Sequence, residues 1–250
     1  MKKINTILAA VSALLMLTVT AANSVEFKAG ISANGMAAYA NAKETIKGTA
    51  GSSTQGTGRT TSEEAVLATS FASIFAEVSS DNMMGLGIGV SYAPEVVDLN
   101  KETRHISSSK DNDAAGTKET AVSGIDTDGG AQVVDAKIND MVSVYLTLPV
   151  GGNGAYIKAG YIQATMVTEE SLATGSKYEN VDMTGTSIGG GYEGSLGDMA
   201  FWRAEGSYQM WEDISASGSE SNNGTTDTTK NKIAAEMGSV MGTLSVGMKF

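Results

Sequence analysis

Cysteine is absent from the 250 residues, histidine occurs once and proline twice. Without cysteine the chain has no disulfide framework and no thiolate metal site. A long apolar run is also missing, because after the N-terminal segment no stretch provides the about 20 apolar residues of a membrane-spanning helix. Residence in a membrane would therefore require β-strands.

The charge is acidic and glycine is abundant. The formal net charge of −11 argues against nucleic acid as a partner, because affinity for nucleic acid comes mainly from cationic side chains. The 30 glycines, and the stretches of Ser, Thr, Asn, Asp and Gly between alternating segments, are typical of an all-β protein. The length fits a single domain.

The N-terminus has the pattern of an export signal. Lys2 and Lys3 precede an apolar run from Ile7 to Val19, which is too short to span a membrane as a helix. We expect residues 1–22 to be a signal peptide, with the cut between 21 and 24, and residues 25–250 to form one barrel domain. The small residues that offer cleavage points are Ala21, Ala22 and Ser24.

Eight segments of the remaining chain alternate apolar residues with small or polar ones. A transmembrane barrel strand shows this pattern because one face meets lipid and the other the lumen. In the clearest segment, large residues from Met84 to Tyr92 alternate with glycine and serine. The segments are Val25–Asn34, Val66–Val78, Met84–Tyr92, Val142–Leu148, Ile157–Tyr161, Ser187–Leu196, Trp202–Met210 and Val240–Phe250.

Two positions test this assignment. In Val66–Val78 we place Ile74 toward lipid and Glu77 in the lumen, because a charge in hydrocarbon costs more than Phe75 facing inward. Asp140 falls on the lipid side of its strand, unless it lies at the interface or a bulge resets the register.

The connections alternate in length. They are short at 79–83, 149–154 and 197–198, and long and polar at 41–64, 93–131, 168–182 and 213–231. Short periplasmic turns, four long external loops and an even strand number are typical of an eight-stranded antiparallel up-and-down transmembrane β-barrel. The alternative is a soluble β-sandwich, whose strands alternate in the same way around an apolar core.

The C-terminal segment Leu244–Phe250, together with Ile74–Val78 and Gly85–Tyr92, resembles the small outer-membrane barrels of the OmpA, OmpX and Opa kind. The resemblance implies residence in the outer membrane of a Gram-negative bacterium, in contact with its lipid and lipopolysaccharide. It also implies that the C-terminal strand is a signal to the barrel-assembly machinery, carried by Leu244, Val246, Met248 and Phe250.

Charged residues of both signs fall on the lumenal side of the predicted strands. An eight-stranded barrel is just filled by side chains, so we expect these charges to pair within the lumen. The alternative is a narrow water-filled path, that is, a small porin-like passive channel. The predicted lumenal charges are Glu26, Lys28, Glu77, Lys158, Glu193, Arg203 and Glu205.

Aromatic residues lie near strand ends or on the lipid side, where they would form an interfacial girdle. These are Tyr92, Tyr161, Trp202 and Tyr208.

Catalytic and metal-binding patterns are weak. His105 stands alone in the second long loop, without the acid or nucleophile that proton transfer would need. The acidic pairs at 111–113 and 126–128 lack the spacing of a calcium loop. We therefore expect no catalytic residue, cofactor or metal, and a structural or surface-interaction barrel whose four external loops contact ligands that the sequence does not name.

Overall fold

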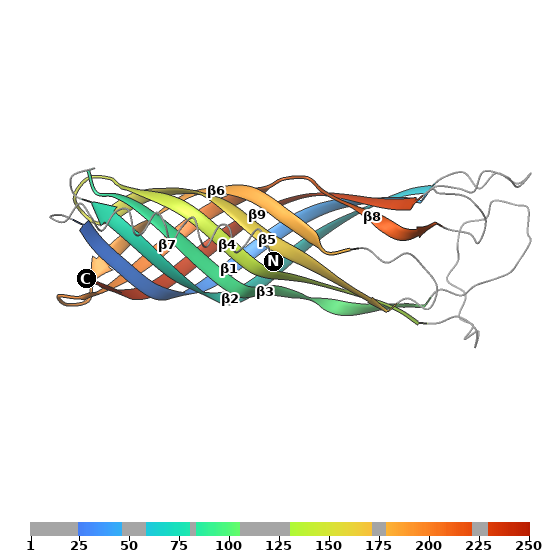
Figure 1. Cartoon of the computed structure of the whole chain (residues 1–250), viewed down its shortest axis with the longest axis horizontal. Coiled ribbons are helices and arrows are strands. Elements are labelled where there is room, and N and C mark those ends of the chain that lie inside the picture. Colours follow the sequence, from blue (N-terminus) through green and yellow to red (C-terminus); the bar gives the residue numbers. More distant parts are fainter. Residues whose placement is uncertain (1–24, 47–58, 81–83, 106–130, 172–178, 222–229) are drawn as a thin grey trace, which may run out of the picture.

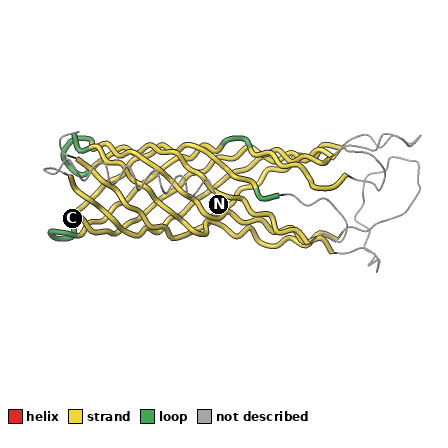
Figure 2. The backbone as a smooth tube through the Cα atoms, viewed as in Figure 1, coloured by secondary structure: helices red, strands yellow, loops and turns green. Residues whose placement is uncertain are grey.

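The computed structural model describes residues 25–46, 59–80, 84–105, 131–171, 179–221 and 230–250. All regular structure within these residues is β-strand (Figure 2). The strands are β1 (Val25–Ile46), β2 (Arg59–Ser80), β3 (Leu86–His105), β4 (Ala131–Pro149), β5 (Ala155–Ser171), β6 (Val181–Ser195), β7 (Ala200–Trp211), β8 (Ile214–Ser221) and β9 (Lys230–Lys249).

These strands form a closed barrel of eight antiparallel staves (Figure 1). β7 and β8 are one stave interrupted at Glu212 and Asp213, because both pair with β9, on either side of a one-residue shift. Pairing of β1 with β9 closes the ring. Consecutive staves are neighbours throughout, so the predicted eight-stranded up-and-down fold is confirmed.

The strands are longer than predicted. β1 and β2 each have 22 residues, and β3 has 20, whereas crossing a membrane takes about 10. The parts predicted as long loops therefore begin later than expected, and His105 is the last residue of β3 instead of a loop residue. The predicted signal peptide and the acidic pairs at 111–113 and 126–128 lie outside the described residues.

Outward-facing residues form an apolar belt with a sharp outer boundary. On β1 the belt runs from Phe27 to Tyr39, which at about 3.3 Å per residue and a tilt of about 40° gives a height of about 30 Å, the thickness of the hydrocarbon core. One rung beyond Tyr39, Asn41 pairs with Glu64 of β2 on one side and with Glu236 of β9 on the other. The belt thus ends on the same rung in three neighbouring strands.

The structure shows the side-chain directions in Val66–Val78 and the position of Asp140, the two points that alternation left open. In β2, Ile74 is exposed on the outer face while Phe75 and Glu77 are buried inside, so the preferred phase is correct. At Asp140 the register shifts and φ is 55°, so a bulge is present, and the carboxylate accepts a 2.6 Å hydrogen bond from Tyr92. Val142 comes directly after this shift, and although its alternation predicts that it faces lipid, it is only 2% exposed.

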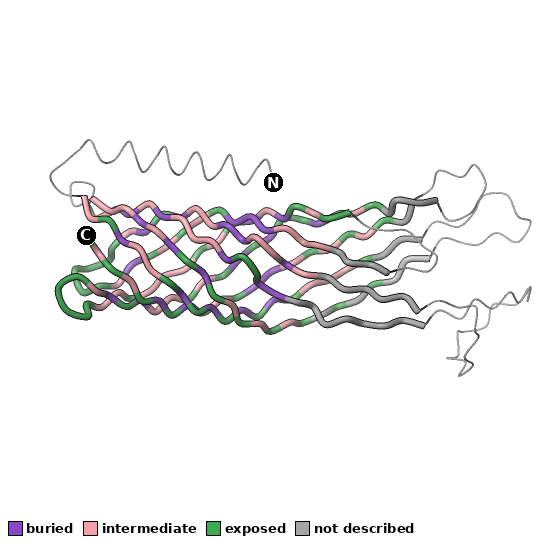
Figure 3. The backbone as a smooth tube through the Cα atoms, turned by 60° about the horizontal axis from the view of Figure 1, so that its bottom comes forward, coloured by how far each residue is buried: buried purple, intermediate pink, exposed green. Residues whose placement is uncertain are grey.

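The outside of this barrel is apolar, and the half of its interior next to Phe250 is charged. This is the reverse of a soluble β-sandwich, whose interior is apolar. Large apolar side chains such as Ile31, Leu244 and Ile188 are exposed on the outer face, while Lys28 and Arg203 are buried inside. Figure 3 shows buried and exposed residues alternating along the strands. Closed strand pairing with an apolar exterior is the arrangement that lipid requires. The chain folds as a transmembrane β-barrel.

No helix of sufficient length and hydrophobicity to cross a membrane is present among the described residues.

Candidate functional site

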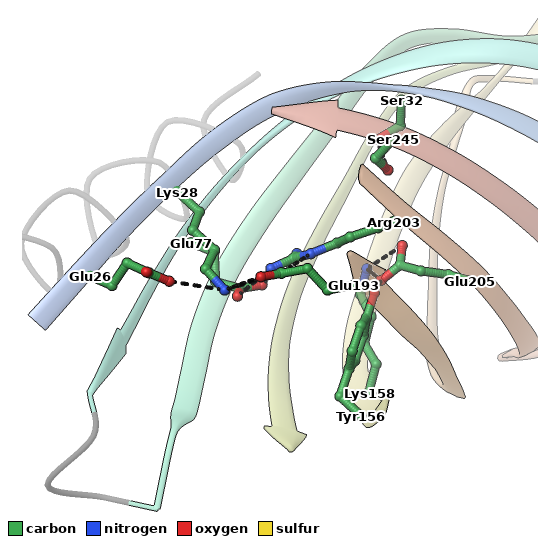
Figure 4. Close-up of polar contacts among 10 residues, drawn as sticks. All are labelled: Glu26, Lys28, Ser32, Glu77, Tyr156, Lys158, Glu193, Arg203, Glu205 and Ser245. Carbon is green, nitrogen blue, oxygen red and sulfur yellow. Dashed lines mark hydrogen bonds and ion pairs between the residues drawn. The ribbon is translucent and has the colours of Figure 1, made fainter. Parts of the chain in front are cut away.

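The half of the lumen next to Phe27 and Phe250 contains charged side chains centred on the guanidinium of Arg203. Arg203 projects inward from β7 (Figure 4). Its Nη1 and Nη2 donate to the two carboxylate oxygens of Glu77 from β2, at 2.9 and 2.7 Å. Its Nε donates to Glu193 from β6, at 2.8 Å. Both side chains of the Arg203–Glu77 pair are almost fully buried, so each charge depends on the other for compensation.

Lys28 of β1 extends this pairing toward the barrel end. Its Nζ donates to both oxygens of Glu193, at 2.8 and 3.0 Å, and lies 3.1 Å from Glu26. Glu193 therefore receives hydrogen bonds from two cations, while Glu26 is half exposed where the lumen meets solvent.

A second pair occupies the adjoining wall. Lys158 of β5 donates to the two oxygens of Glu205 from β7, at 3.1 and 3.2 Å, and the hydroxyl of Tyr156 donates to Glu205 at 2.7 Å. The seven residues predicted to carry lumenal charge thus all contact an oppositely charged partner. We call them the ion network: Glu26, Lys28, Glu77, Lys158, Glu193, Arg203 and Glu205.

Aromatic rings that were not predicted as site residues surround these charges. The guanidinium carbon of Arg203 lies 5.1 Å from the ring centre of Phe201 and 5.4 Å from that of Phe75, and Lys158 Nζ lies 4.0 Å from that of Tyr145. Rings at these distances attract cations and exclude water. Alternation predicts that these rings point inward. Their contacts depend on the stagger between strands, which cannot be predicted from the sequence.

Glycines on the inner face make room for these rings. A Cβ at Gly89 would lie 2.3 Å from the Tyr145 ring, and one at Gly87 would lie 2.3 Å from Thr147. The bare inner side of β3 is therefore filled by side chains of β4. The many lumenal glycines do not leave an open path at this level.

Above the ion network lies a layer of hydroxyl and amide groups. Ser32 and Ser245 share a 2.8 Å hydrogen bond, and Asn34 donates to Ser73 and accepts from Thr243, both at 2.9 Å. These residues are all buried. Their polar groups satisfy one another across β1, β2 and β9, as buried polar groups generally must.

The outer half of the lumen is filled by an apolar cluster. On β1, Met36 and Ala38 follow Ser32 and Asn34 on the same inner face, so one strand passes from charged to hydroxyl to apolar layers. The buried members of the apolar cluster are Met36, Ala38, Ala93, Val96, Val97, Ile138, Met141, Ile162, Ala164, Met183, Trp211 and Ile214. Sequence reasoning missed this cluster, because its residues lie in the parts of the strands predicted as loops or continue beyond the predicted spans.

The four predicted girdle aromatics all lie on outward positions of their strands. Tyr161, Trp202 and Tyr208 are exposed on the outer face, and Tyr92 is half-buried beside Asp140. Tyr39, which was not predicted, donates to or accepts from the Tyr208 hydroxyl at 3.3 Å across β9.

The predicted assembly-signal residues Leu244, Val246 and Met248 face outward on β9. At the end of the chain, Phe250 exchanges two backbone hydrogen bonds with Phe27, at 2.9 and 3.2 Å. The two rings lie 6.1 Å apart. The last residue thus completes the closure between β9 and β1.

Within the described part of the chain, no group of three or more His, Cys, Asp and Glu side chains could hold a metal ion.

Comparison with known proteins finds similarity in three-dimensional structure only. No protein-family model matches the chain, and no curated protein matches its sequence. OprG from Pseudomonas aeruginosa is 13% identical over 91% of this chain and 96% of its own, with a TM-score of 0.45. The protease OmpT from Escherichia coli is 13% identical over 90% and 97%, with a TM-score of 0.46. Ail from Yersinia pestis, solved with the heparin analogue sucrose octasulfate, is 11% identical over 88% and 99%, with a TM-score of 0.38. The fold assignment itself rests on the strand pairing of this chain.

Proposed function

We propose that the protein is a closed, non-enzymatic surface barrel, which anchors four external connections in the outer membrane and does not conduct solutes. The observation that supports this proposal most directly is the double closure of the lumen. The ion network fills its periplasmic half, and the apolar cluster fills its outer half.

The two closures are independent in their chemistry. The Glu77–Arg203 and Lys28–Glu193 pairs of the ion network span non-neighbouring strands, so opening the network would leave Glu77 without its cation. The apolar cluster offers water few polar groups to bind, so a continuous water column through it is unfavourable. A passive channel would require both to open.

The external face is where we place the interactions. Beyond the apolar belt the outward positions become polar, at Asn41, Lys43 and Glu64 on β1 and β2. We propose that this surface meets lipopolysaccharide and that the loops contact further ligands. The alternation of β9 and its terminal Phe250 support recognition by the barrel-assembly machinery.

Planar-bilayer conductance of the mature chain tests the closed state. We expect no stable conductance from the natural sequence, and none from Glu77→Gln, because the apolar cluster remains. Glu236→Gln, on the outer face, is the matched control. A steady stepwise conductance in the natural chain, with an ion selectivity that changes in Glu77→Gln but not in Glu236→Gln, would establish the channel instead.

A further inference from the structure

Tyr39 and Tyr208 meet on the outer wall of the barrel, across its closing strand. Tyr39 belongs to β1 and Tyr208 to β7, and β9 lies between these two strands. In the strand register Tyr39 stands opposite Gly238. Tyr208 stands opposite Val240, two residues further along β9. The two hydroxyl oxygens nevertheless lie 3.3 Å apart, so the phenol rings reach over β9 toward each other.

Gly238 makes this approach possible. A Cβ at this position would lie 2.6 Å from both the Cε1 carbon and the hydroxyl oxygen of Tyr39, which is closer than side chains pack in proteins. Gly238 is itself buried. Any larger residue on this side of β9 would displace the Tyr39 ring, and with it the hydroxyl that meets Tyr208.

Both phenols lie where small molecules from the external water can reach them. Tyr39 is 52% exposed and Tyr208 is 39% exposed. Tyr39 ends the apolar belt on β1, and the outward positions that follow it are Asn41 and Lys43. Tyrosines at such a boundary sit at the level of the lipid head groups. A small polar oxidant therefore reaches the Tyr39 hydroxyl without crossing hydrocarbon.

We propose that Tyr39 and Tyr208 form a site of oxidative cross-linking, at which hydrogen peroxide, with a haem peroxidase as catalyst, couples the two rings to dityrosine. Each phenol gives up one hydrogen atom and becomes a phenoxyl radical, and the peroxide takes up both hydrogen atoms to leave two molecules of water. The radicals form one carbon–carbon bond between the ring positions next to their oxygens. The hydrogens on those two carbons then move to the oxygens and restore both phenols.

The cross-link holds the closing strand in place. It joins β1 to β7 over the outer face of β9, and the pairing of β9 with β1 is what closes the ring. Separation of β1 from β9 then leaves β1 tied to β7. The bond also closes a long loop of the chain between residues 39 and 208, which restricts the unfolded chain as a disulfide does. The oxidised barrel is therefore more resistant to unfolding.

The test is oxidation of the mature chain, refolded in vesicles, by hydrogen peroxide and a haem peroxidase. Digestion and mass spectrometry should find the peptides that contain Tyr39 and Tyr208 joined, with the loss of two hydrogen atoms. The joined product should show dityrosine fluorescence, and its urea unfolding midpoint should rise. Each variant is first shown to refold by its cold and boiled gel mobility.

The variants separate this pair from the other tyrosines. Tyr39→Phe and Tyr208→Phe should each abolish the joined peptides and the rise in midpoint. Tyr161→Phe, which removes another phenol that is exposed on the outer face, is the matched control and should keep both. Gly238→Ala keeps both phenols but displaces the Tyr39 ring, so it should lower the yield of cross-link several-fold.

Equal yields in Gly238→Ala and the natural sequence would overturn the proposal, because coupling would then not depend on the geometry across β9. Dityrosine found only between two copies of the chain would overturn it as well. The same holds for addition of oxygen to the exposed Met210 with both tyrosines left uncoupled.

Discussion

Removal of Arg203 is the sharpest perturbation of the ion network. The side chain of Arg203 is 4% exposed and that of Glu77 is 2% exposed, and two short hydrogen bonds join them. Arg203→Met keeps much of the packing against Phe75 and Phe201 but leaves Glu77 as a buried charge without its cation. Breaking a buried pair in this way costs about 3–5 kcal/mol.

A double variant separates the destabilisation caused by the unpaired charge of Glu77 from that caused by lost packing. Glu77→Leu combined with Arg203→Met replaces both partners by apolar groups, and we expect it to recover most of the loss, because such replacements are often neutral. Lys28→Met is the matched control, since Glu193 keeps Arg203 as a partner. It should cost about 1–3 kcal/mol.

The assay is urea unfolding of the barrel in lipid vesicles, followed by tryptophan fluorescence, with midpoint and slope fitted separately. An Arg203→Met loss below about 1 kcal/mol, or a double variant no more stable than the single one, would show that Glu77 does not depend on Arg203.

Two further variants test the packing of the lumen and the position of the membrane. Gly89→Ala should lower the free energy of unfolding by about 1–3 kcal/mol, because its Cβ would meet the Tyr145 ring, whereas Gly242→Ala, with nothing within 4 Å of the added Cβ, should change it by less than about 0.5 kcal/mol in the same assay. Equal effects would contradict the filled lumen. Ala33→Arg, halfway along the outer belt of β1, should cost about 2–4 kcal/mol, and Tyr39→Arg, at its edge, about 0–1 kcal/mol. The reverse order of costs would place the membrane boundary elsewhere.

Alternation was enough to predict the strands and most of their inward faces, whereas the closed order of neighbours also required the even strand number and the alternating lengths of the connections. It succeeded because each lipid-facing position of a barrel must be apolar or small, so the period of two persists along segments such as Val240–Phe250. It failed where that requirement stops. Within the belt the inner face already turns apolar at Met36 and Ala38, and beyond the belt the outer face turns polar at Asn41 and Glu64. The chemistry of both faces thus changes along each strand, so the strands were predicted to end too early.

For the candidate site, alternation predicts which way a side chain points but not which residue it contacts. Inward parity identified the charged residues, but Lys28 and Glu193 are 165 residues apart, and their contact depends on the stagger of strands around the whole ring. A bulge such as that at Asp140, or the register shift between Glu95 and Val97, changes this stagger locally, and the sequence does not show by how much.

Several pairs of the ion network connect strands that are not neighbours, and this limits when they can form. Two of these pairs join β1 to β6 through Lys28 and Glu193, and β2 to β7 through Glu77 and Arg203. β9 lies between β7 and β1, and its inward residues from Thr243 to Gly247 are small or hydroxylated. The Lys28–Glu193 and Glu77–Arg203 pairs therefore belong to the closed ring, whereas the Glu193–Arg203 pair joins directly opposed residues of β6 and β7 and can form within that hairpin. We expect the first two pairs to stabilise the closed ring and the third to stabilise the β6–β7 hairpin as well.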